Sequence, residues 1–206
     1  MRTKEKSTNV YFLRHGQTDF PLDRIYCDER EDPSLNSEGL YQAKCAAITL
    51  KNLNISKIYS SPAKRTQMTA SEVSAVTNLP VETVPSWVER RFGVWEGLYF
   101  KEIEDKYPEE YLNWKKDNVG YTPEGGETIN DVRERLSGSL KGIIEAHRGE
   151  SILIVSHVGP IRVTLCESLN TPIENYRQFR VDYASISRVD YGLTRNNLIK
   201  INFYSY

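Results

Sequence analysis

Four residues of types that bind and transfer phosphate lie where predicted strands end. The chain has three histidines, of which His15 follows the first apolar run and His157 follows the most apolar one. Arg14 adjoins His15, and Arg65 lies one turn into a helix that follows another strand. Ligands bind beyond the carboxyl ends of strands in an open α/β sheet, so we expect these four residues to converge. Because arginine donates paired hydrogen bonds to phosphate oxygens, and Gly16 lets backbone amides approach, the pattern predicts a site for a dianionic ligand.

Other chemistries fit these residues less well. Taken alone, each histidine or arginine has an ordinary explanation as a surface or core residue. Paired histidines also suggest a metal site, but neither lies in HxxxH or HExxH, and the adjacent arginines would repel a cation. The acidic run 28–32 does not match a calcium loop. Ser156-His157 suggests a serine hydrolase, but the chain has no GxSxG elbow, and adjacent residues on a strand point to opposite faces. We therefore expect no metal.

The elements that must position these residues alternate between strand and helix patterns. Ser61-Pro62 supplies a predicted helix N-cap and a first-turn proline, and Thr128 caps the helix with the clearest apolar stripe, which we expect to end at Gly149. The pattern predicts an α/β fold: a three-layer sandwich with a mostly parallel central sheet flanked by helices. The aromatic and charged stretch at about 87–125 predicts a small helical lid inserted in a single domain, 1–206. Strands are predicted at 10–13, 55–60, 80–84, 151–155, 185–189 and 198–204, and helices at 37–51, from 61–62, from 128 and after 157–160.

Composition narrows the class of protein. The 206 residues carry 27 Lys and Arg against 28 Asp and Glu, so the net charge of −1 argues against a general nucleic-acid or membrane-surface binder. No apolar run approaches the ~20 residues that span a bilayer, and the polar first residues do not resemble a signal peptide. Three cysteines, Cys27, Cys45 and Cys166, form neither an even disulfide set nor a CxxC pair. We expect reduced thiols in a cytoplasmic protein.

A series of short motifs resembles one family. Leu13-Arg14-His15-Gly16-Gln17-Thr18 is similar to the signature of the histidine phosphatase superfamily, the phosphoglycerate-mutase-like enzymes. Further matches follow in the family's order and span positions 13 to 162: Asp32-Pro33-Ser34-Leu35-Asn36, Ile58-Tyr59-Ser60-Ser61-Pro62-Ala63-Lys64-Arg65-Thr66, Glu89 with Phe92-Gly93-Val94-Trp95-Glu96-Gly97, Pro123-Glu124-Gly125-Gly126-Glu127-Thr128, and Val155-Ser156-His157-Val158-Gly159-Pro160-Ile161-Arg162.

The resemblance implies a role for each matching position. His15 resembles the nucleophile that becomes phosphorylated, and Glu89 resembles the proton donor. Arg14, Arg65 and a protonated His157 resemble the pocket that stabilises charge on the phosphoryl oxygens. The implied catalytic set is therefore His15, Glu89, His157, Arg14 and Arg65, and the implied substrate contacts are Arg14, Gln17, Thr18, Arg65, His157 and Val158. No metal or other cofactor is implied.

The implied activity is that of a phosphoric monoester hydrolase acting through a phosphohistidine on a small phosphorylated metabolite, as a monomer or homodimer. The sequence looks closest to α-ribazole and broad-specificity phosphatases. The alternatives are a phosphoglycerate mutase, which resembles longer chains, and a non-catalytic phosphate-binding module on the same fold. Two departures bear on substrate preference: Pro21 stands where the family often has asparagine, and the stretch 28–31 is unusually charged. Glu96 and Glu127 are further candidates for substrate contact.

Overall fold

The computed structural model describes residues 7–26 and 31–204, and its centre is a sheet of six strands. The strand order is β3-β2-β4-β1-β5-β6. Adjacent strands among the first four pair in parallel, whereas β5 pairs antiparallel with both β1 and β6. The expected mostly parallel sheet is therefore confirmed, with an antiparallel hairpin at one edge. The strands are β1 Thr8–Arg14, β2 Ile55–Ser60, β3 Val81–Thr83, β4 Ser151–Ser156, β5 Ile186–Tyr191 and β6 Asn196–Phe203.

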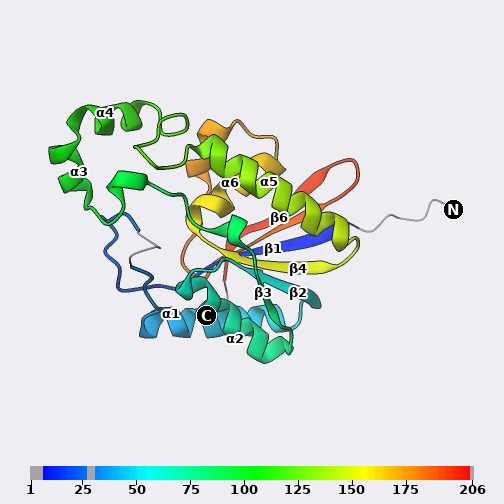
Figure 1. Ribbon diagram of the computed structural model, residues 1–206. Coiled ribbons are helices and arrows are strands. Elements are labelled where there is room, and N and C mark those ends of the chain that lie inside the picture. The colour runs from blue at the N-terminus through cyan, green and yellow to red at the C-terminus, as the bar shows by residue number, and fades with distance from the viewer. Residues whose placement is uncertain (1–6, 27–30, 205–206) are drawn as a thin grey trace.

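Helices cover both faces of the sheet, which confirms the three-layer sandwich. Helices α1 (Ser37–Lys51) and α2 (Lys64–Thr77) lie on one face, and α5 (Ile129–Ala146) and α6 (Val158–Ser168) lie on the other (Figure 1). Side chains of a strand alternate between the two faces. In β1, Tyr11 and Leu13 pack with residues of α1 and α2, whereas Val10 and Phe12 pack with residues of α5 and α6.

The pairing of β1 with β4 places the two candidate histidines at one edge. Arg14, the last residue of β1, is in register with Ser156, the last residue of β4. The residues that follow these two strands are His15 and His157, and the amide of His15 donates to the Ser156 carbonyl at 3.1 Å. Residues that are far apart in the sequence therefore meet at the carboxyl ends of parallel strands, as expected.

The stretch between β3 and α5 folds into short helices around a small core of its own. Helices α3 (Phe100–Lys106) and α4 (Pro108–Lys116) stand apart from the sheet in Figure 1, and two 3₁₀ turns precede them, η1 (Pro85–Trp87) and η2 (Gly93–Trp95). A third 3₁₀ turn, η3 (Ile173–Gln178), follows α6. Ile25, Trp95, Ile103 and Trp114 are the buried residues of this small core. We call the segment 93–116 the lid.

Two predicted helix ends are wrong. Helix α2 begins at Lys64 after an Ala63 that makes no side-chain cap hydrogen bond, so Ser61 is not its N-cap. The Ser61 hydroxyl instead bonds the ring of His157, as described below. Helix α5 ends at Ala146, and Gly149 adopts a φ of 81° in the turn that leads into β4. Thr128 does form the expected cap, together with Asp131 in a capping box.

No helix within residues 7–26 and 31–204 is long and apolar enough to cross a bilayer. Cys45 and Cys166 are free thiols, and Cys27 lies outside the described residues together with most of the charged stretch 28–31.

Candidate active site

His15 is buried at the end of β1, with one ring nitrogen fixed by the backbone. Its Nδ1 lies 2.8 Å from the carbonyl oxygen of Gly16. A carbonyl oxygen only accepts hydrogen bonds, so Nδ1 carries the proton and Nε2 keeps its lone pair. Gly16 packs closely against the start of α1, since a Cβ there would clash with the carbonyl oxygen of Gly39. The local backbone therefore leaves Nε2 of His15 without a proton.

Two arginines flank this ring. Arg14 donates to the carbonyl of Val181 at 2.9 Å, and its guanidinium lies 3.9 Å from the centre of the Tyr183 ring. Arg65, in the first turn of α2, is fully buried and lies 4.2 Å from the centre of the Tyr26 ring. Stacking on an aromatic face holds each guanidinium plane in place. Nη1 of Arg65 also lies 3.6 Å from Oδ1 of Asp32.

The hydrogen bonds of His157 define its tautomer. Arg65 Nη2 lies 3.0 Å from Nδ1 of His157, and because guanidinium only donates, Nδ1 is the acceptor. Nε2 then carries the proton and donates to Ser61 Oγ at 2.8 Å. The rings of His15 and His157 are 5.3 Å apart between centroids. Every hydrogen bond of His157 is therefore consistent with a neutral ring.

The charge states of both histidines follow from this setting. Burial, followed by the positive charges of Arg65 and Arg14, holds the pKa of His15 well below its ordinary value of 6.5. Burial and Arg65 also lower the pKa of His157. The protonated His157 that the family resemblance implies belongs to the site with a phosphoryl group bound, and it stays a prediction. In the structure, burial together with Arg65 and Arg14 disfavours the charged forms of both imidazoles, and Asp32 Oδ1 lies 3.6 Å from Arg65 Nη1.

Glu89 lies beside the N-terminus of α6. The amide of Arg90 donates to its Oε1 at 2.8 Å, and the amide of Gly159 donates to its Oε2 at 3.3 Å. Burial raises the pKa of this carboxyl group, whereas the two amides and the arginines Arg65 and Arg14 lower it by a smaller amount. The contact is close, since a Cβ on Gly159 would lie 2.3 Å from Glu89 Oε1. Glu89 is therefore a carboxyl group that holds its proton to a higher pH than usual.

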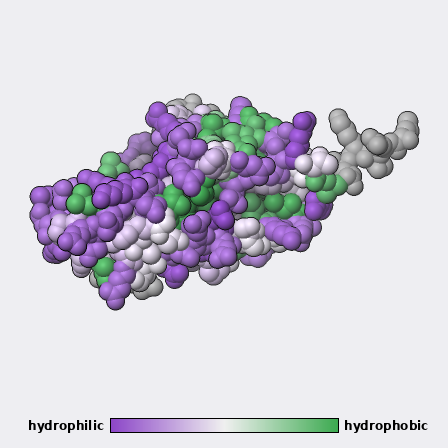
Figure 2. Space-filling model, turned by 90° about the horizontal axis from the view of Figure 1, so that it is seen from above, coloured by the Kyte–Doolittle hydropathy of each residue, from purple (hydrophilic) through white to green (hydrophobic). Residues whose placement is uncertain are grey.

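The remaining candidate contacts lie on two sides of this cluster. Gln17 and Thr18 line one hollow of about 410 Å³, which they share with Pro21 and Tyr183. Val158 lines a different cavity of about 390 Å³ that Glu89 also borders. In Figure 2, apolar side chains appear green in the hollowed surface between the lid at the left and the rest of the molecule.

The structure separates the other candidate groups by what they contact. Glu127 is buried and paired with Arg135 at 2.9 Å and with Arg91 at 3.1 Å, which is a structural role. Glu96 accepts from the amide of Phe92 at 3.0 Å and lines a hollow together with Glu89. Ser156 donates to the carbonyl of Trp87 at 2.6 Å, so it does not act with His157 as a serine nucleophile.

Sequence reasoning missed three residues that shape the site. Ser61 bonds His157, Tyr26 lies under Arg65, and Tyr183 lies under Arg14. The signal for Ser61 is its place in the Ser60-Ser61-Pro62 motif, which also fits a helix cap. Tyr26 and Tyr183 come from loops with no periodicity, so no signal in the sequence marks them.

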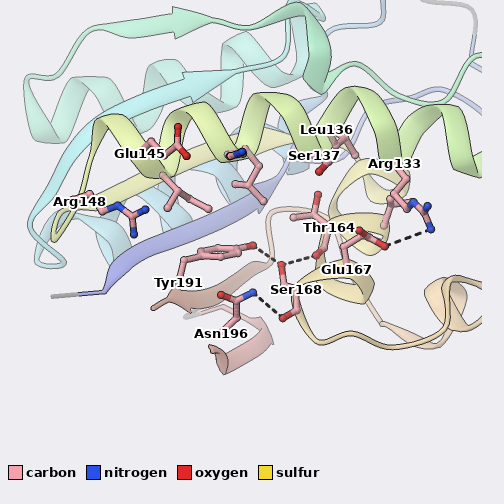
Figure 3. Close-up of a pocket in the computed structure, with 14 residues that line it drawn as sticks. Arg133, Leu136, Ser137, Glu145, Arg148, Thr164, Glu167, Ser168, Tyr191 and Asn196 are labelled. Atoms are coloured by element: carbon pink, nitrogen blue, oxygen red, sulfur yellow. Dashed lines mark hydrogen bonds and ion pairs between the residues drawn. The ribbon is translucent and has the colours of Figure 1, made fainter. Parts of the chain in front are cut away.

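Two further observations concern metal binding and a second cavity. No group of three or more His, Cys, Asp or Glu side chains in residues 7–26 and 31–204 is placed to hold a metal ion. A groove of about 340 Å³ runs between α5 and α6, and none of the predicted site residues lines it (Figure 3).

The pKa directions give a prediction for the ligand-free protein. In an NMR titration, the rings of His15 and His157 should stay neutral from about pH 8 to about pH 6, because burial and the arginines disfavour their charged forms. Adding inorganic phosphate should raise the pKa of His157. His15→Ala and His157→Ala variants assign the signals. A midpoint for either ring at or above 6.5 in the free protein would contradict the described geometry.

Known proteins resemble this chain in sequence and in fold. The sequence matches the histidine phosphatase superfamily (branch 1) over residues 10–203. Phosphoserine phosphatase 1 of Hydrogenobacter thermophilus is 33% identical over 194 residues, which cover 94% of this chain and 91% of that protein. A protein named probable phosphoglycerate mutase GpmB, of Cronobacter sakazakii, is 32% identical over 186 residues, which cover 88% of this chain and 84% of that protein. The crystal structure of the α-ribazole phosphatase of Shigella flexneri superimposes with a TM-score of 0.86 at 27% identity, covering 95% of this chain and 96% of that one.

Proposed function

The chain belongs to the histidine phosphatase superfamily, and on this premise we propose that it hydrolyses small phosphate monoesters through a phosphohistidine at His15, without a metal ion. One observation carries the proposal. The backbone bond at 2.8 Å from Nδ1 of His15 to Gly16 leaves Nε2 unprotonated in a buried site beside Arg14 and Arg65. A neutral imidazole with a free lone pair is a nucleophile, and arginines stabilise the oxygens of the phosphoryl group that it attacks.

The proposed reaction has two steps. In the first, Nε2 of His15 forms a bond to phosphorus while the bond from phosphorus to the alcohol oxygen breaks, and the protonated Glu89 gives its proton to that oxygen. In the second, Glu89 takes a proton from water, whose oxygen attacks phosphorus and releases His15 and inorganic phosphate. Arg14 and Arg65 hold the phosphoryl oxygens in both steps. Once a dianion is present, His157 takes up a proton and donates to it.

A phosphoglycerate mutase is the second candidate. Chain length does not exclude it, because the mutase-named relative matches over 84% of its own length. The two activities differ in the acceptor, which is water for a phosphatase and a second phosphoglycerate for a mutase. A non-catalytic module is the weakest candidate, since such a module has no use for a nucleophile, a proton donor and two arginines held in place around one another.

The experiment is a product analysis on chelator-treated protein. We expect one inorganic phosphate for each alcohol released from p-nitrophenyl phosphate and from alkyl esters, with the same rate before and after EDTA, because Arg14 and Arg65 stabilise the charge that a metal ion would otherwise stabilise. A control reaction with two phosphoglycerates measures transfer.

Three outcomes would contradict the proposal. Loss of activity with EDTA, restored by a divalent metal, would remove the claim of metal independence. Transfer to the second phosphoglycerate in preference to water would favour the mutase. A folded protein that turns over none of these esters would favour the non-catalytic module.

We also propose that the protein works in the cytoplasm on a small phosphorylated metabolite, as a monomer or homodimer. The free thiols of Cys45 and Cys166 support a reducing compartment. The net charge of −1 gives no support to a nucleic-acid or membrane partner.

A further inference from the structure

The cavity that borders Glu89 is lined mainly by cations and aromatic rings. It has a volume of about 390 Å³ and lies between the lid and the first turns of α5 and α6. Among the described residues that line it, Glu89 is the only carboxylate, whereas the arginines are Arg24, Arg90, Arg162 and Arg177. Glu89 borders this cavity as well as the hollow that Glu96 lines, so a leaving group that takes its proton from Glu89 has room to extend here. The charge of the cavity therefore bears on which alcohols the site accepts.

Two of the four arginines are already engaged by the protein. Arg24 forms a bidentate ion pair with Glu31, at 2.6 and 2.7 Å. Arg90 is buried and donates to three backbone carbonyls, of Glu127 at 2.7 Å, Asn118 at 3.1 Å and Tyr121 at 2.8 Å. These bonds hold the side chains of Arg24 and Arg90 in the wall of the cavity.

Arg162 and Arg177 each form fewer hydrogen bonds with the rest of the protein. Arg162 donates to the carbonyl of Phe179 at 2.8 Å, and Arg177 donates to the Tyr176 hydroxyl at 3.0 Å while lying 5.0 Å from the centre of a Trp114 ring. Within residues 7–26 and 31–204, neither forms an ion pair with a carboxylate. Burial lowers the pKa of Arg162 most, and the charges of Arg14 and Arg177 lower it further, whereas Tyr176 and Glu89 raise it by a smaller amount. A half-buried cation that forms no ion pair costs free energy that an incoming anion would offset.

We propose that this cavity selects phosphate monoesters whose alcohol part carries a second negative group, a carboxylate or a second phosphate, held by Arg162 and Arg177. The inference rests on the proposed function and specifies its substrate class. Arg162 is one helical turn beyond Gly159, whose amide holds Glu89, so the second anion lies on the far side of the leaving-group oxygen from His15. The rings of Phe100 and Trp114, stacked at 6.2 Å, give the carbon skeleton an apolar wall.

The test compares substrates that differ only in the second charge. The carboxylate pairs are 3-phosphoglycerate with glycerol 3-phosphate and phosphoserine with phosphoethanolamine, and the phosphate pair is fructose 1,6-bisphosphate with fructose 6-phosphate. We expect kcat/KM to favour the more anionic member by about tenfold or more, because ion pairs in a partly desolvated site discriminate by this amount. Which pair shows the larger ratio distinguishes a carboxylate from a phosphate.

Variants of the exposed Arg177 test whether this side chain causes the preference for the more anionic substrate. Arg177→Gln should reduce that ratio by about two- to fivefold, the range expected for an exposed ion pair, and Arg177→Glu should reduce it further, because a carboxylate would repel the second anion. The matched control is Arg148→Gln, which removes the same charge from the groove between α5 and α6 (Figure 3) and should leave the ratio unchanged. Thermal unfolding confirms that each variant is folded.

The possible failures are distinguishable. Equal kcat/KM within all three pairs, or equal effects of Arg177→Gln and Arg148→Gln on the ratio, would overturn this inference while leaving the phosphatase in place. Absence of turnover on every ester, p-nitrophenyl phosphate included, would overturn the proposed function and this inference with it.

Discussion

Replacing His15 by alanine should reduce turnover of every phosphate ester by about 10⁴-fold or more, because the replacement removes the atom that attacks phosphorus. The loss should be the same for p-nitrophenyl phosphate as for an alkyl ester, since both need the same nucleophile. The free energy of unfolding should fall by about 1–3 kcal/mol, because the replacement leaves a cavity where a buried ring bonded the carbonyl of Gly16.

The matched control is the third histidine. His147 lies at the end of α5, where its ring bonds the hydroxyl of Tyr59 at 2.9 Å and the carboxylate of Glu150 at 2.9 Å. His147→Ala should keep its kcat/KM within about twofold of that of the unchanged protein, since these contacts hold the far end of the sheet. A His15→Ala protein that keeps near-normal turnover would show that another group is the nucleophile.

Replacing Glu89 by glutamine should have an effect that depends on the leaving group. An alkoxide is a poor leaving group that needs a proton as its bond to phosphorus breaks, whereas p-nitrophenolate leaves unaided. Phosphoenzyme formation should therefore slow by about 10²–10⁴-fold for an alkyl ester and much less for p-nitrophenyl phosphate. Burial raises the pKa of Glu89, which favours the protonated form that this role requires.

Single-turnover measurements separate the two proposed roles of Glu89. They report the first step alone, without the later attack of water. Glu96→Gln is the control, since Glu96 is a neighbouring carboxylate that lines a hollow with Glu89. Equal slowing for both leaving groups would indicate a structural role for Glu89. A leaving-group dependence in Glu96→Gln instead would move the proton donor to that residue.

Much of the fold was predictable because its core follows simple periodicities. The apolar run before His157 is buried on both faces, as the four consecutive apolar residues 152–155 indicate, and the stripe after Thr128 packs on the sheet at helical spacing. The meeting of both histidines at one edge was predicted from their places after strands, whereas the pairing of β1 with β4, which puts Arg14 opposite Ser156, was not. Helix ends were less predictable, because Ser61 has the chemistry of a cap and is used elsewhere.

The convergence of four candidate residues was predictable, whereas the hydrogen bonds among them were not. Residue types at strand ends indicated a dianion site at His15, Arg14, Arg65 and His157, but the role of Glu89 came only from the family resemblance. No local pattern shows that Arg65 donates to Nδ1 of His157, because this bond joins residues 92 positions apart. The cationic cavity was equally hidden, since its arginines come from loops and helices that only the folded chain brings together.

Trapping the covalent bond between phosphate and His15 decides whether the proposed intermediate exists. The protein is mixed with a ³²P-labelled phosphate ester, quenched in alkali, where phosphohistidine survives, and digested for peptide mapping. We expect label on the peptide that contains His15, absent from His15→Ala and present in His147→Ala. Label on any other residue, or full hydrolysis with no labelled protein at any quench time, would contradict it.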